Sequence, residues 1–358
     1  MLSLEGFASI IHQWLYNHFN PTWALLTEFV LVGIAAIVLF AVLGLSLVWM
    51  ERKVAAVMQI RLGPNRVGPK GIFQTTADTL KLIMKEGLVP DGADKLIFNL
   101  APFVVMIVAM LILAPIAFAK RFQIWDINIG VLYLSAISSL SVIGVFMAGW
   151  ASNNKYSLLG AMRSGAQIVS YELSAGLSVL SIVVMTGSLS INDIIQSQQN
   201  GWWIFKAHIP ALISFVIFII AVTAETNRAP FDMAEAESEL TAGFHTEYSG
   251  MRFALFFLAE YINIFIVCAI GATLFFGGWM PFHIGRWQAF NHIMDYIPSS
   301  IWFFGKTIGL IFLIMWFRWT FPRLRIDQLL NLEWKYLLPI SMFNLLLMTV
   351  VAILGWHF

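Results

Sequence analysis

Long apolar runs are the feature that most limits what this chain of 358 residues can fold into. A run of about 20 apolar residues is typical of a helix that crosses a bilayer, because a helix satisfies its backbone hydrogen bonds internally. Only 11% of the residues are charged, against about 25% in a soluble domain. Eight such runs occur, at about 25–50, 96–119, 131–151, 163–186, 204–224, 252–277, 300–320 and 337–357.

The runs predict an all-α polytopic membrane protein with eight transmembrane helices and additional interfacial amphipathic helices. Residues 25–358 form one membrane domain in this prediction. Residues 1–24 are a separate interfacial segment, because their apolar side chains recur at helical spacing and no basic signal-peptide start precedes them. A frayed terminal tail is the alternative for this segment.

The distribution of Lys and Arg predicts the orientation of the chain in the membrane. Sixteen of these residues fall on one side of the eight spans and five on the other. We therefore expect the first side, with its long loops at about 51–95 and 225–251, to face the cytoplasm. Both termini then face the periplasm of a bacterial cell, with the chain in the inner membrane. The inner membrane of a mitochondrion, with the first side in the matrix, is the alternative.

The sequence contains no pattern for a redox centre or nucleotide site. Its single cysteine, Cys268, lies inside an apolar run and cannot hold an iron–sulfur cluster alone. The seven histidines are scattered, and no phosphate-binding glycine motif occurs. We predict no metal site, no catalytic residue and no nucleic-acid partner. The net charge of +1 gives no information about nucleic acid.

The loop at about 51–95 combines a turn-rich segment with an amphipathic one. Its opening, "ERKVAAVMQIRLGPNRVGPKG", contains glycines and prolines that prevent a long helix. The following "IFQTTADTLKLIMKEG" places apolar residues on one helical face and Asp78 and Lys81 on another, which predicts a helix along the membrane surface. A strut with lysines on lipid phosphates is the simpler interpretation. Arg61 and Arg66 in the turn indicate a rigid presentation of cations to an anionic neighbour or a polar headgroup.

The loop at about 225–251 is acidic. Asp232 followed by Glu235 has the spacing of a helix start, and Gly243 is expected to end that helix. Capping alone does not explain Glu239, which repels Glu235 from one turn away. Local helix capping and a surface that attracts protons or cations are both compatible with the pattern. The six carboxylates are Glu225, Asp232, Glu235, Glu237, Glu239 and Glu247.

Two further carboxylates, Glu172 and Glu260, fall inside the predicted spans. A charged side chain at the centre of a membrane helix costs roughly 2.5–3.5 kcal/mol on insertion scales. From the nearest arginines along their helices, both lie roughly 12–13 Å below the inner surface. With Glu225 at the rim they define a path for protons from the acidic loop to mid-membrane. Neutral, hydrogen-bonded acids that fix helix packing are the alternative.

Three segments carry a family resemblance. "ERKVAAVMQIRLGPNRVGPKG", "AETNRAPFDMAEAESELTAGFHTEYSG" and the "YEL" of the fourth span resemble the quinone-site membrane subunit of proton-pumping NADH–quinone oxidoreductase, respiratory complex I. The resemblance implies quinone as substrate, with FMN and iron–sulfur clusters held only by partner subunits. It implies hydrophilic iron–sulfur partners on the cytoplasmic side and small and antiporter-like partners in the membrane.

The resemblance also implies roles for residues. Those of the quinone chamber would be Glu51, Arg52, Arg61, Asp78 and Lys81. Those of the proton path would be Glu172, Glu225, Glu235, Glu237, Glu239 and Glu260.

Two other functions compete with this interpretation. A free-standing secondary transporter would use Glu172 and Glu260 as its ion site, although the chain shows no sequence repeat of the kind common in transporters. The related subunit of a membrane-bound hydrogenase would couple without quinone. The basic first loop favours the quinone branch.

Overall fold

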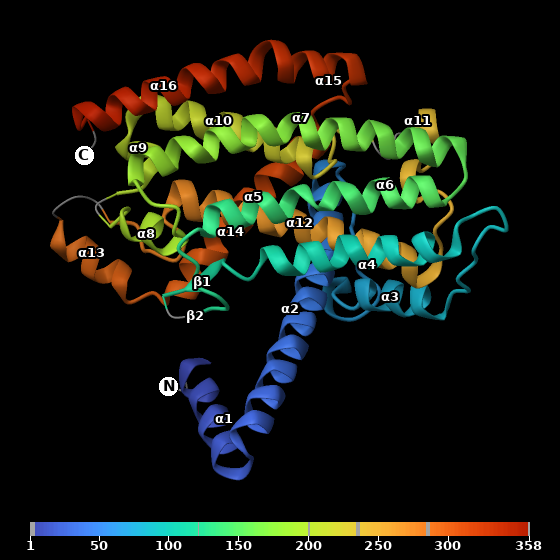
Figure 1. The fold of residues 1–358 in the computed structure, drawn as a ribbon, viewed down its shortest axis with the longest axis horizontal. Helices are drawn as coiled ribbons and strands as arrows, with labels where there is room; N and C mark the ends of the chain where they lie inside the picture. The colour runs from blue at the N-terminus through green and yellow to red at the C-terminus, as the bar shows by residue number, and fades with distance from the viewer. Residues whose placement is uncertain (1–3, 121, 200, 234–236, 284–286, 357–358) are drawn as a thin grey trace.

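The computed structural model describes residues 4–120, 122–199, 201–233, 237–283 and 287–356, which form a bundle of helices (Figure 1). Eight segments within these ranges are long and apolar enough to cross a membrane, which confirms the predicted fold class. They are Pro21–Met58 (α2), Lys95–Ile112 (α4), Gly130–Ala151 (α5, Gly130–Ser139, and α6, Ser141–Ala151), Lys155–Thr186 (α7), His208–Glu225 (α10), Gly250–Phe276 (α12), Ser299–Thr320 (α14) and Ile326–Leu354 (α15, Ile326–Leu332, and α16, Leu338–Leu354).

The first spanning helix, α2, differs from the others in length and inclination. Its 38 residues rise about 57 Å, more than the roughly 30 Å core of a bilayer requires. Figure 1 shows it steeply inclined, with its N-terminal half outside the bundle. The helix α1 (Leu4–His18) precedes it and is tied to it by His12 Nδ1, 3.0 Å from Glu28 Oε1. The predicted N-terminal segment is therefore helical, and Pro21 rather than residue 25 begins the span.

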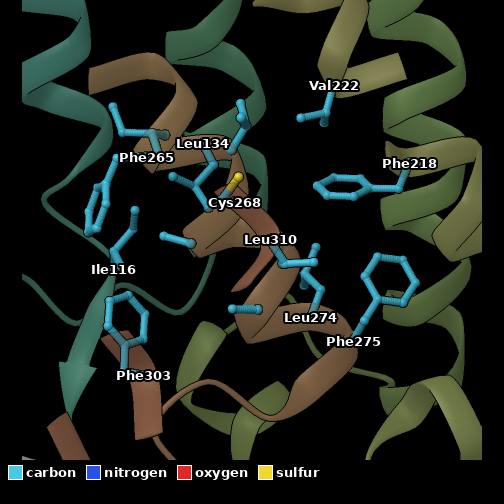
Figure 2. Packing of buried hydrophobic residues seen from close by; sticks show 14 of the residues in the cluster. Ile116, Leu134, Phe218, Val222, Phe265, Cys268, Leu274, Phe275, Phe303 and Leu310 are labelled. Atoms are coloured by element: carbon cyan, nitrogen blue, oxygen red, sulfur yellow. The ribbon is translucent and has the colours of Figure 1, made fainter. Parts of the chain in front are cut away.

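The helix α12 lies at the centre of the bundle and contacts α2, α4, α7, α10 and α14. Its C-terminal half, which we call the outer half after the predicted orientation, packs against α10 and α14 through aromatic and aliphatic side chains (Figure 2). Phe265, Phe275 and Phe303 are at most 2% exposed, and Cys268 lies among them. This apolar packing fixes α12, and therefore also fixes the polar residues near its inner end.

The third span is interrupted, although the sequence predicts one continuous helix over 131–151. At Leu140 the ladder shifts to the tighter pattern of a 3-10 turn, with the Leu140 amide 3.1 Å from the Ile137 carbonyl. Serine hydroxyls crowd this point and bond to nearby carbonyls, including Ser139 to Ser135 at 2.9 Å. Such bonds compete with the helical ladder and explain why apolarity alone did not predict the break.

The second span ends earlier than predicted. The helix α4 stops at Ile112, and the short strand β1 (Ala117–Ala119) pairs antiparallel with β2 (Phe122–Gln123). Pro115 cannot continue the helix, and its carbonyl accepts a hydrogen bond from Gln123 Nε2 at 2.8 Å. The prediction of helix to residue 119 was therefore wrong at this end.

Short elements lie at the two ends of the bundle (Figure 1). With the hairpin lie α8 (Ile191–Gln196), α9 (Trp203–Lys206) and α13 (Gln288–Asp295). The opposite, inner end has α3 (Gln74–Met84), the predicted amphipathic helix, and α11 (Glu237–Leu240), with 3-10 turns at Pro69–Gly71 and Gly243–His245. In the acidic loop the helix ends at Leu240, before the predicted stop at Gly243. Its start is predicted by Asp232 followed by Glu235; Asp232 is described and lies outside a helix, and residues 234–236 lie outside the described residues.

Candidate functional site

A partly buried cluster of four charged side chains lies near the inner end of the bundle, around Arg228. Arg228 is 4% exposed, and its Nη1 donates to both carboxylate oxygens of Glu51 at 3.0 Å. Its Nε lies 2.8 Å from Glu260 Oε1. Arg318, in the last turn of α14, donates to Glu51 Oε1. The guanidinium of Arg228 also lies over the ring of Tyr261, 4.4 Å from its centre.

The charges of this cluster compensate one another. Two arginines face two carboxylates, so each charge has a partner that offsets the cost of leaving water. Burial lowers the pKa of Arg228, but the carboxylates of Glu260 and Glu51 outweigh it and hold that pKa above its usual value. Arg228 therefore stays charged and joins Glu51 of α2 to Glu260 of α12.

A cavity of about 350 Å³, larger than the two small cavities described below, lies between α2, α3 and α12. Arg52, Asp78 and Lys81 line one part of it, with Arg52 Nη1 2.5 Å from Asp78 Oδ2. Asp78 is also bound by Gln74 Nε2 at 3.3 Å. Most of the remaining wall is aliphatic, and Tyr261 joins the wall to the arginine cluster. An apolar channel with a few polar groups suits an amphiphilic ligand with a small polar head.

The apolar wall depends on a close approach of α2 and α12. A Cβ placed on Gly44 would lie 2.2 Å from Leu258 Cδ1. Both residues line the cavity, so a larger side chain at position 44 would push into the channel or displace α12.

Arg61 lies apart from the other four residues predicted for the quinone chamber. Its Nε donates to Gln59 Oε1 at 2.6 Å, and the residue is exposed. The loop that holds it is tightly folded, because Gly71 has a φ of +75° and a Cβ there would lie 2.1 Å from the Pro64 carbonyl oxygen. The structure thus brings Arg52, Asp78 and Lys81 together and places Glu51 behind them in the arginine cluster.

Three of the predicted proton-path carboxylates line two adjoining cavities. Glu260 and Glu225 line the first, of about 60 Å³. Glu225 and Glu172 line the second, of about 110 Å³. The two cavities share the wall residues Glu225, Thr226, Asn263 and Ser141. A file of polar groups therefore runs from the arginine cluster past Glu225 to Glu172 in the middle of α7.

The break in the third span supplies part of this wall. Ser138 and Ser141 line the second cavity beside Glu172, and Ser139 donates a hydrogen bond to Glu172 Oε1. These serines belong to the interrupted stretch between α5 and α6. The interruption thus places hydroxyl groups against a carboxyl group in the middle of the spanning helix α7.

The remaining acids of the loop bind neighbouring segments. Glu239 Oε2 lies 2.5 Å from Arg163 Nη1 on α7, and Asp232 Oδ2 lies 2.7 Å from Arg323 Nη2. Glu247 accepts from Asn154 at 2.5 Å. Glu235 and the side chain of Glu237 lie outside what the structure describes. Part of the acidity in this loop therefore fastens it to α7 and to the loops beside it.

Sequence reasoning missed the two arginines that organise the cluster. The sequence pattern used Arg228 and Arg318 only as two of the positive charges that predict the orientation of the chain in the membrane. A signal for Arg228 exists in "AETNRAPFD", where one arginine follows a span and stands close to a carboxylate. Arg318 has no such local signal, because its partner Glu51 is 267 residues away.

Metal ligation has no support in this region. Across the ranges that the structure describes, no group of three or more His, Cys, Asp and Glu residues converges as a metal site would require.

Comparisons with known proteins agree in the family that they indicate. Residues 30–349 match the NADH dehydrogenase family. The NADH-quinone oxidoreductase H subunit of Bacteroides fragilis is 54% identical over 358 residues, which is the full length of both chains. The protein of that name from Bacteroides thetaiotaomicron is 55% identical over 97% of each chain. That from Brevibacillus brevis is 48% identical over 93% of this chain and 95% of its own.

Proposed function

Because the chain belongs to the family of NADH-quinone oxidoreductase H subunits, we propose that it forms the quinone chamber with partner subunits and couples quinone reduction to proton translocation. One observation carries this proposal. Tyr261 and Arg228 stand between the cavity of Arg52, Asp78 and Lys81 and the polar file of Glu260, Glu225 and Glu172.

The chemistry of the larger cavity fits a quinone. Its aliphatic walls suit an isoprenoid tail, and the side chains of Arg52 and Lys81 can donate hydrogen bonds to quinone carbonyl oxygens. Reduction to the quinol takes two electrons and two protons. The electrons would come from NADH through the FMN and iron–sulfur clusters of partner subunits. Asp78 is held by Arg52 and Gln74 close to where those protons are consumed.

The arginine cluster offers a physical link from reduction to the polar file. A change of charge or proton occupancy near Arg52 and Asp78 alters the field on the Arg228–Glu260 pair, which lies in low dielectric. A shift in that pair changes how strongly Glu260 holds a proton. Glu225 and Glu172 follow along the shared cavities, so the shift can pass on as a rearrangement of protons.

The same interpretation proposes the setting of the protein in the membrane. The loops at the inner end would dock iron–sulfur subunits on the cytoplasmic side. Membrane faces of the bundle would contact lipid and the small and antiporter-like subunits. The chain would lie in the bacterial inner membrane with both termini on the periplasmic side.

A hydrogenase-type coupling subunit is the nearest competing function. The three relatives favour the quinone branch, since each is named as part of a quinone oxidoreductase. A free-standing transporter is less compatible with these names. Purification in mild detergent separates this case, because a transporter would run alone, without an iron–sulfur partner.

Photolabelling of the intact complex with a quinone analogue tests the chamber. We expect label on residues 51–81, competed by excess quinone and reduced by Arg52→Ala. Label confined to other segments would contradict the chamber and favour the hydrogenase-type function. Coupling is tested by Glu260→Gln and Glu225→Gln in proteoliposomes, where we expect assembled enzyme that moves fewer protons per electron. Assembled variants with normal quinone reduction and normal transport would show that these acids are structural.

A further inference from the structure

A second file of buried polar groups follows one face of α7, toward α10 and α16 (Figure 1). Its members recur every three or four residues and therefore share one helical face. From residue 164 to residue 181 the file rises about 26 Å, close to the roughly 30 Å of a bilayer core. All are at most 7% exposed, and we call them the hydroxyl seam: Ser164, Gln167, Tyr171, Ser174, Ser178 and Ser181 on α7, with Ser214 on α10 and Asn344 on α16.

A carboxyl group that the first polar file does not include lies in this seam. Glu333 is 1% exposed, and Ser174 donates to its Oε1. Its Oε2 is buried and has no hydrogen-bond partner among the described residues. Glu333 also begins the π-helical turn Glu333–Leu337 between α15 and α16, an irregularity that is frequent at functional positions.

The seam continues from Glu333 toward the outer surface. Ser181 and Ser214 lie 2.7 Å apart, and Asn344 Nδ2 donates to Ser214 at 2.7 Å and to the Pro210 carbonyl at 3.0 Å. Ser181 in turn donates to the Ser178 carbonyl at 2.6 Å. Asn344 Oδ1 is a second buried acceptor that no described residue satisfies.

Helix packing explains the hydroxyls but leaves the carboxyl unexplained. Serine and asparagine commonly join membrane helices through hydrogen bonds. A buried carboxylate among these groups costs more free energy than a serine or glutamine, because no cation pairs with Glu333 in the ranges that the structure covers. Binding a proton removes this cost. A carboxyl group that holds a proton in these surroundings can also release it.

We propose that Glu333 is a proton-binding site that exchanges protons along the hydroxyl seam between α7, α10 and α16. This rests on the proposed coupling function and adds a second route to it. In each step one O–H bond breaks and one forms, so every hydroxyl accepts a proton as it gives one up. Glu333 remains a carboxylate until a proton from the inner side restores it. Two steps join hydroxyls that are not hydrogen-bonded to each other, Ser174 to Ser178 and Ser178 to Ser181, because Ser178 donates to the Ala175 carbonyl and Ser181 to the Ser178 carbonyl. The proposal requires a bridging water molecule at each of these two steps.

The test uses the intact complex in proteoliposomes with Glu333→Gln. Glutamine keeps the shape and the acceptor for Ser174 but cannot exchange a proton. We expect normal electron transfer from NADH to an artificial acceptor and fewer protons moved per electron. We also expect the loss of one carboxylic-acid C=O band from the infrared difference spectrum recorded on reduction. Wild-type proton transport with an unchanged spectrum would overturn the proposal.

Matched variants separate the seam from a general effect of removing hydroxyls. Ser181→Ala interrupts the seam and is expected to lower the protons moved per electron. Thr349→Ala removes a hydroxyl on α16 that bonds within its own helix, to Leu345, and is expected to match the wild type. If Glu333→Gln fails to assemble, Ser181→Ala decides: normal transport by this variant overturns the seam.

Glu260→Gln distinguishes the two proposals. If it lowers proton transport while Glu333→Gln and Ser181→Ala do not, the seam is wrong and the proposed function stands. If all three variants transport normally, both proposals fail.

Discussion

The two halves of α12 follow opposite rules within one helix. The inner half holds Glu260, Tyr261 and Asn263, which face Arg228 or the two small cavities that Glu225 joins. The outer half, from residue 264 to residue 276, packs its buried aromatic and aliphatic side chains against α10 and α14 (Figure 2).

The difference indicates where protons can be held. A charge is tolerable in the inner half because Arg228 and polar walls accompany it, and it would be costly in the apolar outer half. In the proposed function, a proton that reaches Glu260 therefore has no direct way outward along α12. The proposed route leads instead through Glu225 to Glu172 on α7.

The largest effect is expected from removing the charged partner of the inner half of α12. Arg228→Met removes the cation between Glu51 and Glu260 and leaves buried carboxylates with incomplete compensation. Removing one partner of a buried pair typically costs about 3–5 kcal/mol. We expect poor assembly, a clearly lower Tm of the complex and loss of quinone reductase activity.

The control for Arg228→Met is the double variant Arg228→Met with Glu260→Gln, which removes charges of both signs. It should recover part of the lost stability, because fewer unpaired charges remain. Equal stability of the single variant and the wild type would mean that the cluster is not a buried network of ion pairs.

The next largest effect is expected from a substitution in the apolar outer half of α12. Phe265→Ala leaves a cavity in the outer packing. We expect the free energy of unfolding to fall by about 2 kcal/mol. This is less than the roughly 3–5 kcal/mol lost in soluble cores, because lipid is as apolar as the buried side chains and the burial of apolar groups contributes less in a membrane.

The measurement for Phe265→Ala uses Cys268, the only cysteine in the sequence and a buried one. Its rate of alkylation on heating, read by mass spectrometry of this chain, should rise at a lower temperature than in the wild type. Protons moved per electron at ambient temperature should not change. A change in this ratio without a stability loss would mean that the outer half takes part in proton transfer.

A smaller effect concerns the cavity beside the charged half. Arg52→Ala removes a cation that holds Asp78 and lines the proposed chamber. We expect quinone turnover to fall about tenfold, equivalent to roughly 1.4 kcal/mol. Electron transfer from NADH to an artificial acceptor should be unaffected. If both activities fall together, the residue serves assembly instead.

The comparison also shows what the sequence could predict. Apolar run length predicted eight spans, because lipid requires long helices, and amphipathic spacing predicted the helix that the structure shows as α3. Carboxylates inside spans drew attention to Glu172 and Glu260, because such residues are rare. These signals are local.

The missed features depend on contacts between distant segments. Glu51 meets Arg318 across 267 residues, and Glu333 meets Ser174 across 159. The break at Leu140 depends on serine side chains competing for the backbone, which no apolarity pattern reports. Glu333 also lies just before a predicted span, where a charged residue is common and gives no reason to select it.

The smallest expected effect separates Arg61, in the loop after α2, from Arg52, near the C-terminal end of α2. Arg61 is exposed and bonds Gln59, whereas Arg52 lines the cavity. Exposed substitutions usually change stability by less than about 0.5 kcal/mol. Arg61→Ala should therefore leave the Tm of the complex within experimental error. Its quinone turnover should fall less than that of Arg52→Ala, because this chain does not place Arg61 in the cavity wall. A fall as large as that of Arg52→Ala would show that Arg61 completes the chamber together with a partner subunit.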